Sequence, residues 1–154
     1  MTMRRRERTQ VLVDSAPELA HRLAARVEEV AQVVDVTPAH QGLVLCQVRE
    51  TARNQRFYLG EALMSEARVR IGSTVGLGAA LGGNGELARD LAVIDAALSQ
   101  PEPLPVAAEL EAELVAAKAE LERDRAVSAA QALSSRVEFN TMRGQDKNVI
   151  REVK

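Results

Sequence analysis

A glycine-rich segment, VGLGAALGGNGE at residues 75–86, has the most obvious capacity for chemistry in this sequence. Glycines let backbone N–H groups approach a phosphate, and the N-terminus of a following helix favours negative charge. The segment lacks the Lys-Ser/Thr pair of a P-loop and the glycine spacing of a dinucleotide site. A structural interpretation is favoured, in which Gly76 and Gly78 accommodate close packing in the sheet, residues 82–85 turn the chain and Asn84 caps a helix. The residues that could contact a phosphate are Gly82, Gly83 and Asn84.

Asp95 is a second candidate, because it lies among apolar residues in the segment AVIDAAL. A carboxylate at the edge of a buried stripe needs a cationic or N–H partner. Acid–base catalysis is the alternative, but neither a second carboxylate nor a histidine is placed to work with Asp95. We therefore expect a structural ion pair there.

The other reactive side chains are few: His21, His40 and a single cysteine, Cys46. One thiol cannot form an internal disulfide, and this set lacks the ligand spacing of a zinc site. We expect His21 to be solvated, His40 to lie in a turn and Cys46 to be a buried, unreactive thiol. No nucleophile–base constellation can be assembled. The sequence therefore indicates no catalytic residue, and no metal or cofactor bound by this chain alone.

The composition narrows the class of protein. The chain has 154 residues, of which 46% are apolar and 27% charged, which suits one globular domain. A net charge of −2 and an aromatic content of 2% give no argument for binding nucleic acid. No apolar run approaches the length of a membrane span, and the basic start, MTMRRRER, is not followed by the apolar segment of a signal peptide. We expect a cytoplasmic protein that contacts no membrane.

Hydrophobic periodicity predicts the elements that position these residues. The predicted helices cover residues 6–14, 16–29 and the segment after the glycine turn, and the predicted strands cover residues 42–50, 55–72 and 73–81, with a further strand at 33–38. This order predicts an α+β domain over residues 1–98, with an antiparallel β-sheet and helices on one face.

The remainder of the chain changes character. Residues 99–105 form a proline-rich linker, residues 106–133 a long Ala-rich helix, and residues 134–154 an extended C-terminal arm and tail. The apolar stripe of the long helix is interrupted by ERDR at residues 122–125. We expect the helix to twist, leave its support or pass between surfaces at that point.

The arm contains SSRVEFNTMRG at residues 134–144, with one of only two phenylalanines in the chain. Residues 135–144 resemble the C-terminal signature of the G subunit of the carbon–phosphorus lyase core complex. The segments GLVLCQVR, RFYLGEALMSEARVRI and VGLGAALGGNGELARDLAVIDAAL resemble further parts of that family in the same order. The resemblance covers nearly the whole chain, but residues 147–154 have no counterpart.

The resemblance implies a role in phosphonate catabolism. It implies a non-catalytic subunit that acts with companion subunits of the H, I and J types. Together they would replace the adenine of ATP by a phosphonate, giving ribose 1-phosphonate 5-triphosphate. ATP would be a substrate of the complex, with no cofactor bound by this chain alone. The alternative function is a stand-alone nucleotide- or phosphate-binding protein that uses the turn at residues 82–85.

The arm is the predicted partner-binding segment. Val137, Phe139 and Thr141 alternate on one side of an extended chain, and buried aromatic anchors dominate many interfaces. The full set of predicted partner-binding residues is Arg136, Val137, Phe139, Thr141, Met142 and Arg143. The alternative is that the arm folds back as an edge strand of its own sheet.

Overall fold

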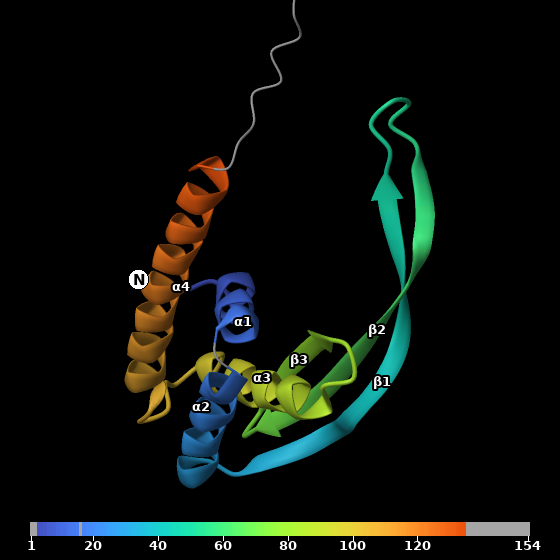
Figure 1. The fold of residues 1–154 in the computed structure, drawn as a ribbon. Coiled ribbons are helices and arrows are strands. Elements are labelled where there is room, and N and C mark those ends of the chain that lie inside the picture. The colour runs from blue at the N-terminus through green and yellow to red at the C-terminus, as the bar shows by residue number, and fades with distance from the viewer. Residues whose placement is uncertain (1–2, 16, 135–154) are drawn as a thin grey trace, which may run out of the picture. The chain divides into compact units, whose positions relative to one another are not determined.

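Figure 1 shows the protein as a computed structural model that describes residues 3–15 and 17–134. The elements are α1 Arg5–Asp14, α2 Pro17–Val30, β1 Val33–Arg49, β2 Arg56–Ile71, β3 Thr74–Leu81, α3 Gly85–Leu98 and α4 Ala107–Ser134. The chain divides into two compact units, Met1–Leu121 and Glu122–Lys154. The sheet and the core belong to the first unit.

The sheet has three antiparallel strands in the order β1-β2-β3, which confirms the predicted α+β class. The two predicted strands at 33–38 and 42–50 form one continuous strand, β1, with local shifts of register. β3 pairs with β2 only from Met64 to Ile71. Beyond that point β1 and β2 continue as a two-stranded segment, residues 42–63, which we call the ribbon (Figure 1).

The helix α3 packs directly on the sheet, against β2 and β3. Gly76 and Gly78 of β3 face it, and a Cβ atom at either position would overlap the backbone of α3 at Ala92 or Ala88. The absence of side chains therefore sets how closely the helix approaches. The sequence predicted close packing within the sheet at these glycines, whereas the structure shows that they make room for α3.

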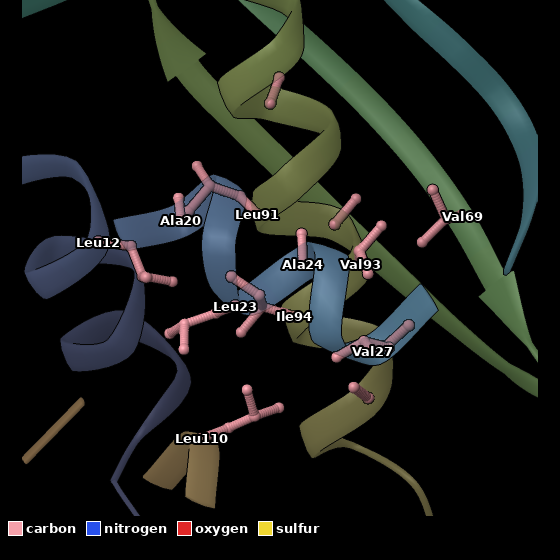
Figure 2. Packing of buried hydrophobic residues seen from close by; sticks show 14 of the residues in the cluster. Leu12, Ala20, Leu23, Ala24, Val27, Val69, Leu91, Val93, Ile94 and Leu110 are labelled. Carbon is pink, nitrogen blue, oxygen red and sulfur yellow. The ribbon is translucent and has the colours of Figure 1, made fainter. Parts of the chain in front are cut away.

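The core lies on one side of the sheet, where the helices gather (Figure 1). Val69 of β2 and Ile94 of α3 are fully buried, and α2 adds Leu23 and Val27 from the other side of α3 (Figure 2). Leu110, near the start of α4, is also fully buried in this cluster. Nearly all the fully buried large side chains are aliphatic, as expected for a chain with so few aromatic residues.

Candidate functional site

Asp95 of α3 joins three elements. Its Oδ1 accepts hydrogen bonds from Arg5 Nε at 2.6 Å and Arg8 Nη2 at 3.3 Å, both from α1. Its Oδ2 accepts from Arg5 Nη2 at 2.5 Å and from the backbone N–H of Leu77 in β3 at 3.0 Å. Asp95 and Arg8 are both buried, and the carboxylate forms ion pairs with Arg5 and Arg8.

The four N–H groups that donate to the Asp95 carboxylate limit the chemistry that it can perform. A carboxylate offers about four lone-pair positions, and here four N–H groups occupy them. A general base needs a lone pair that faces the proton it removes. The geometry therefore favours a structural role, in which Asp95 holds α1 against the edge of β3.

The glycine turn between β3 and α3 is also engaged by its own structure. Asn84 caps α3, since its side-chain oxygen accepts from the Leu87 N–H at 3.0 Å. The carbonyl of Gly82 accepts from the buried Ser65 hydroxyl at 2.9 Å, and its N–H donates to Leu63. A phosphate at Gly82, Gly83 and Asn84 would compete with these bonds, and contact there stays a prediction.

His21 and Asp90 form a pair on the helical side. His21 Nδ1 lies 3.3 Å from Asp90 Oδ2, with the imidazole exposed and the carboxylate largely buried. Burial raises the pKa of Asp90 above its ordinary value, and the hydrogen bond with His21 opposes this shift. The neighbouring Arg89 binds Glu28 at 2.7 Å and Asp35 at 3.0 Å. Its pKa is raised, first by the hydrogen bond to Glu28.

A second cluster connects α2 to the beginning of α4. Glu113 accepts hydrogen bonds from Arg22 at 3.0 Å and from Arg26. The hydrogen bond from Arg22 is the main cause that lowers the pKa of Glu113, and the charge of Arg26 adds to it. These partly exposed pairs join α2 to the start of α4.

His40 and Cys46 lie apart from these clusters, on β1. His40 was expected in a turn, and this is wrong: it lies within β1, is exposed, and its Nδ1 lies 3.3 Å from the carbonyl of Pro38. Cys46 was expected to be buried, and this is wrong: the thiol is partly exposed, because the ribbon has no helix over it. Within residues 3–15 and 17–134, no three His, Cys, Asp or Glu side chains gather closely enough to hold a metal ion.

A groove of about 600 Å³ runs between α1 and the edge of β3. Its walls combine apolar side chains, such as Val13 and Leu77, with the guanidinium groups of Arg5 and Arg6. Because Arg5 is committed to Asp95, Arg6 is the basic group that remains to face a ligand there. The carboxylate of Asp14 also lines the groove, so its walls carry charges of both signs beside the apolar side chains.

The ribbon is the largest functional feature that the sequence interpretation missed. Opposite residues of the two strands project to the same face. Leu43, Leu45, Tyr58 and Leu63 lie on one face and Val44, Val48 and Phe57 on the other, and all are exposed. An uncovered apolar surface is a common feature of protein interaction sites. The signal was present in the sequence, because the run LVL is apolar at odd and even positions alike, whereas a half-buried strand alternates.

The predicted partner-binding residues of the arm, from Arg136 to Arg143, lie outside the described residues, as does its alternative as an edge strand. Among the helices that the structure does describe, none combines the length and apolar character needed to cross a membrane.

The comparisons with known proteins address the whole chain. No curated protein matches it. The model of one family, described as phosphonate metabolism protein PhnG, matches residues 3–144, which include every described element from α1 to α4. The match confirms the resemblance seen in the terminal signature and in the strand and helix segments, and gives the chain a role in phosphonate metabolism. The chain belongs to the PhnG family.

Proposed function

We propose that this chain is a non-catalytic subunit of the carbon–phosphorus lyase core complex, and that its companions are subunits of the H, I and J types. ATP is the substrate of the complex. A phosphonate oxygen bonds to the anomeric carbon of the ribose as the bond to adenine breaks, and adenine leaves with a proton. The product is ribose 1-phosphonate 5-triphosphate. We assign no cofactor to this chain, and we place the reaction in the cytoplasm, where ATP is supplied.

The observation that carries this proposal is the uncovered ribbon. Large apolar side chains such as Leu45 and Phe57 remain in water on both of its faces, at a cost that only a partner can recover. The carboxylate most open to a catalytic interpretation, Asp95, has its oxygens occupied by Arg5, Arg8 and Leu77. The exposed ribbon offers a surface for assembly, and the oxygens of Asp95 are not free for catalysis. Both features support the role of a subunit whose companions supply the catalytic groups.

The C-terminal arm belongs to the same proposal. Phe139 is its anchor in a companion, and Arg136 and Arg143 add charge-assisted hydrogen bonds at the periphery. We expect Phe139→Ala to weaken assembly by about 2–4 kcal/mol. The two arginine-to-alanine variants should have smaller, salt-dependent effects. A lower melting temperature of the isolated chain with intact assembly would instead favour an edge strand.

Reconstitution tests the proposal. The H-, I- and J-type companions are mixed with ATP and methylphosphonate, with or without this chain, and adenine release is followed. We expect release only when this chain is present. Equal release without it would refute the subunit role. Tight binding of ATP to the isolated chain, lost on substitution within residues 82–85, would favour the nucleotide-binding alternative.

A further inference from the structure

We propose that the ribbon, residues 42–63, inserts into a two-walled apolar slot of a companion subunit, with acidic residues at the closed end of the slot. This inference rests on the proposed function, since it names how one companion is engaged. It is drawn from the distribution of apolar and charged side chains over the ribbon, together with its open edges.

Both faces of the ribbon need a cover. Leu45, on one face, is 58% exposed, and Val44, on the other, is 52% exposed. The pair Leu43–Leu63 extends the first surface toward β3, and the pair Val48–Phe57 extends the second toward the tip, residues 49–56. Glu61, opposite Leu45, is an exposed charge on the first face. A flat partner buries only one face and leaves the other in water. A single partner that encloses the ribbon removes both surfaces from water.

The open edges of the ribbon also support an enclosing partner. In the described sheet β1 is a terminal strand, and β3 accompanies β2 only as far as Met64. Along residues 56–63 both outer edges of the ribbon therefore lack a neighbouring strand. Isolated two-stranded segments are marginally stable in water, and open edges invite pairing. A surrounding slot would stabilise the ribbon and shield its edges.

The positive charge of the tip favours acidic residues at the closed end of the slot. Residues 49–56 contain Arg49, Arg53 and Arg56 against Glu50 alone, so three positive charges less one negative charge leave +2, in a chain whose net charge is −2. The tip is held in shape, because Arg49 donates to Asn54 at 3.0 Å and the Arg53 N–H donates to Glu50 at 2.7 Å. Charges on an ordered turn favour an acidic partner surface.

A second copy of this chain fits these features less well. In a two-fold pair each copy covers the same face of the other, so the second apolar face of each ribbon stays exposed. Edge-to-edge pairing of two ribbons leaves both faces exposed. A companion with a separate fold has neither restriction.

Single substitutions on the two faces test the slot. The variants are Leu45→Ser on one face, Val44→Ser on the other, and Val115→Ser as a matched control, an exposed valine of α4 at 56%. The dissociation constant of each variant is measured against immobilised, co-purified H-, I- and J-type companions. We expect each ribbon variant to weaken binding by about tenfold or more. The control should stay within about twofold of the unchanged chain, and the melting temperatures should agree.

Each outcome decides one point. Weaker binding by the variant of one face only would show that the partner contacts a single face, and would overturn the slot. Loss on neither face, with the unchanged chain still bound, would remove the ribbon from the interface while leaving the proposed function intact. Failure of the unchanged chain to bind the companions would refute the proposed function itself. A concentration-dependent dimer of the isolated chain, abolished by both ribbon variants, would overturn the slot in favour of a second copy.

The tip and the behaviour of the isolated chain need separate measurements. Arg53→Glu should slow association by about tenfold at low salt, and the difference should shrink as the salt concentration rises. An unchanged association rate would overturn the acidic end of the slot. If the isolated chain aggregates, tagged variants compete with the untagged unchanged chain during co-expression with the companions. The fraction of tagged chain in the purified complex then gives the same ranking.

Discussion

The strands β1 and β2 have two environments: a base, residues 64–71 of β2 with their partners, which is covered by α3, and the ribbon, which no helix of the described residues covers. At the base, β2 lies under α3, and Ala67, Val69 and Ile71 are buried. In the ribbon, the continuation of the same strand exposes Phe57, Tyr58 and Leu59. The residue types are equally apolar, so composition does not separate the two regions. Coverage by a helix separates them, and this teaches that an apolar strand can be built for a partner as well as for its own core.

A matched pair of glycine substitutions should give the largest contrast between base and ribbon. Gly78→Ala places a methyl group against the backbone of α3 at Ala88 and Ala92, which cannot move aside without shifting the helix. We expect it to lower the free energy of unfolding by about 3 kcal/mol, the upper end of the usual cost of overpacking. Gly42→Ala in the ribbon meets no atom within 4 Å and should change stability by less than about 0.5 kcal/mol. Denaturant unfolding measures both, and equal effects would break the comparison.

The second-largest contrast between the ribbon and the base should be in the rates of amide hydrogen exchange. Amides of the ribbon should exchange about 100-fold faster than those of residues 64–71, because a two-stranded segment without a packed face opens locally. Mass spectrometry of exchange in the isolated chain measures this ratio. Addition of the companions should slow the ribbon and leave the base almost unchanged. Uniform protection along β2 would contradict the distinction.

The next-largest effect is expected for Asp95→Asn, which should lower the free energy of unfolding by about 1–3 kcal/mol. The amide keeps one acceptor oxygen but cannot match both guanidinium groups, and Arg8 is left buried without its full partner. Turnover per assembled complex should stay near that of the unchanged chain, because the change affects the base and not the ribbon. A loss of activity by several orders of magnitude with unchanged stability would make Asp95 catalytic.

The smallest expected effects are pH-dependent and lie on the helical side. Glu113 has a lowered pKa in the folded state, so its contribution is present above its ordinary pKa of 4.5 and is lost as the pH falls through the lower folded value. Glu113→Gln should therefore cost less than about 1 kcal/mol at pH 7, since the pair is partly exposed. The cost should disappear in acid. Unfolding measured between pH 7 and pH 3 follows it, and a constant difference would contradict the pairing with Arg22.

Asp90 has the opposite sign and serves as the comparison for Glu113. Its pKa is raised on folding, so protonation favours the folded state below its ordinary pKa of 3.8, and this contribution is lost as the pH rises through the folded value. Asp90→Asn should thus gain relative stability as the pH rises from about 3.8 to neutrality. The same unfolding series measures it. A gain toward acid would contradict burial as the dominant cause.

The helices and the order of the strands could be predicted because their signals are local. α2 and α4 begin and end within about one residue of the predicted positions, and the cap at Asn84 was read from residue type. Close packing at Gly76 and Gly78 was expected from their small size, but the sequence did not show that α3 is the element packed there. These features depend on neighbours in the sequence or on spacing along one element.

The exposure of the ribbon could not be predicted by the same reasoning. Periodicity shows which residues share a face, but it does not show how far a covering helix reaches. Cys46 was placed in the core because it alternates with Val44 and Val48, yet no helix extends over that part of β1. Likewise the aspartate at position 95 needed a partner, but the sequence could not say that Arg5 and Arg8 would supply it from the other end of the domain.

The separation of Arg5 from Asp95 has a consequence for the order of events during synthesis. The two residues are 90 positions apart, so α1 leaves the ribosome long before its partner exists. At about 5–20 residues per second, the delay is roughly 5–18 s. The hairpin of β1 and β2 needs only a short loop and can form within that time. The helix α1 is therefore synthesised well before α3 but docks only after it, and the guanidinium groups of Arg5 and Arg8 remain available to other acidic molecules until α3 is complete.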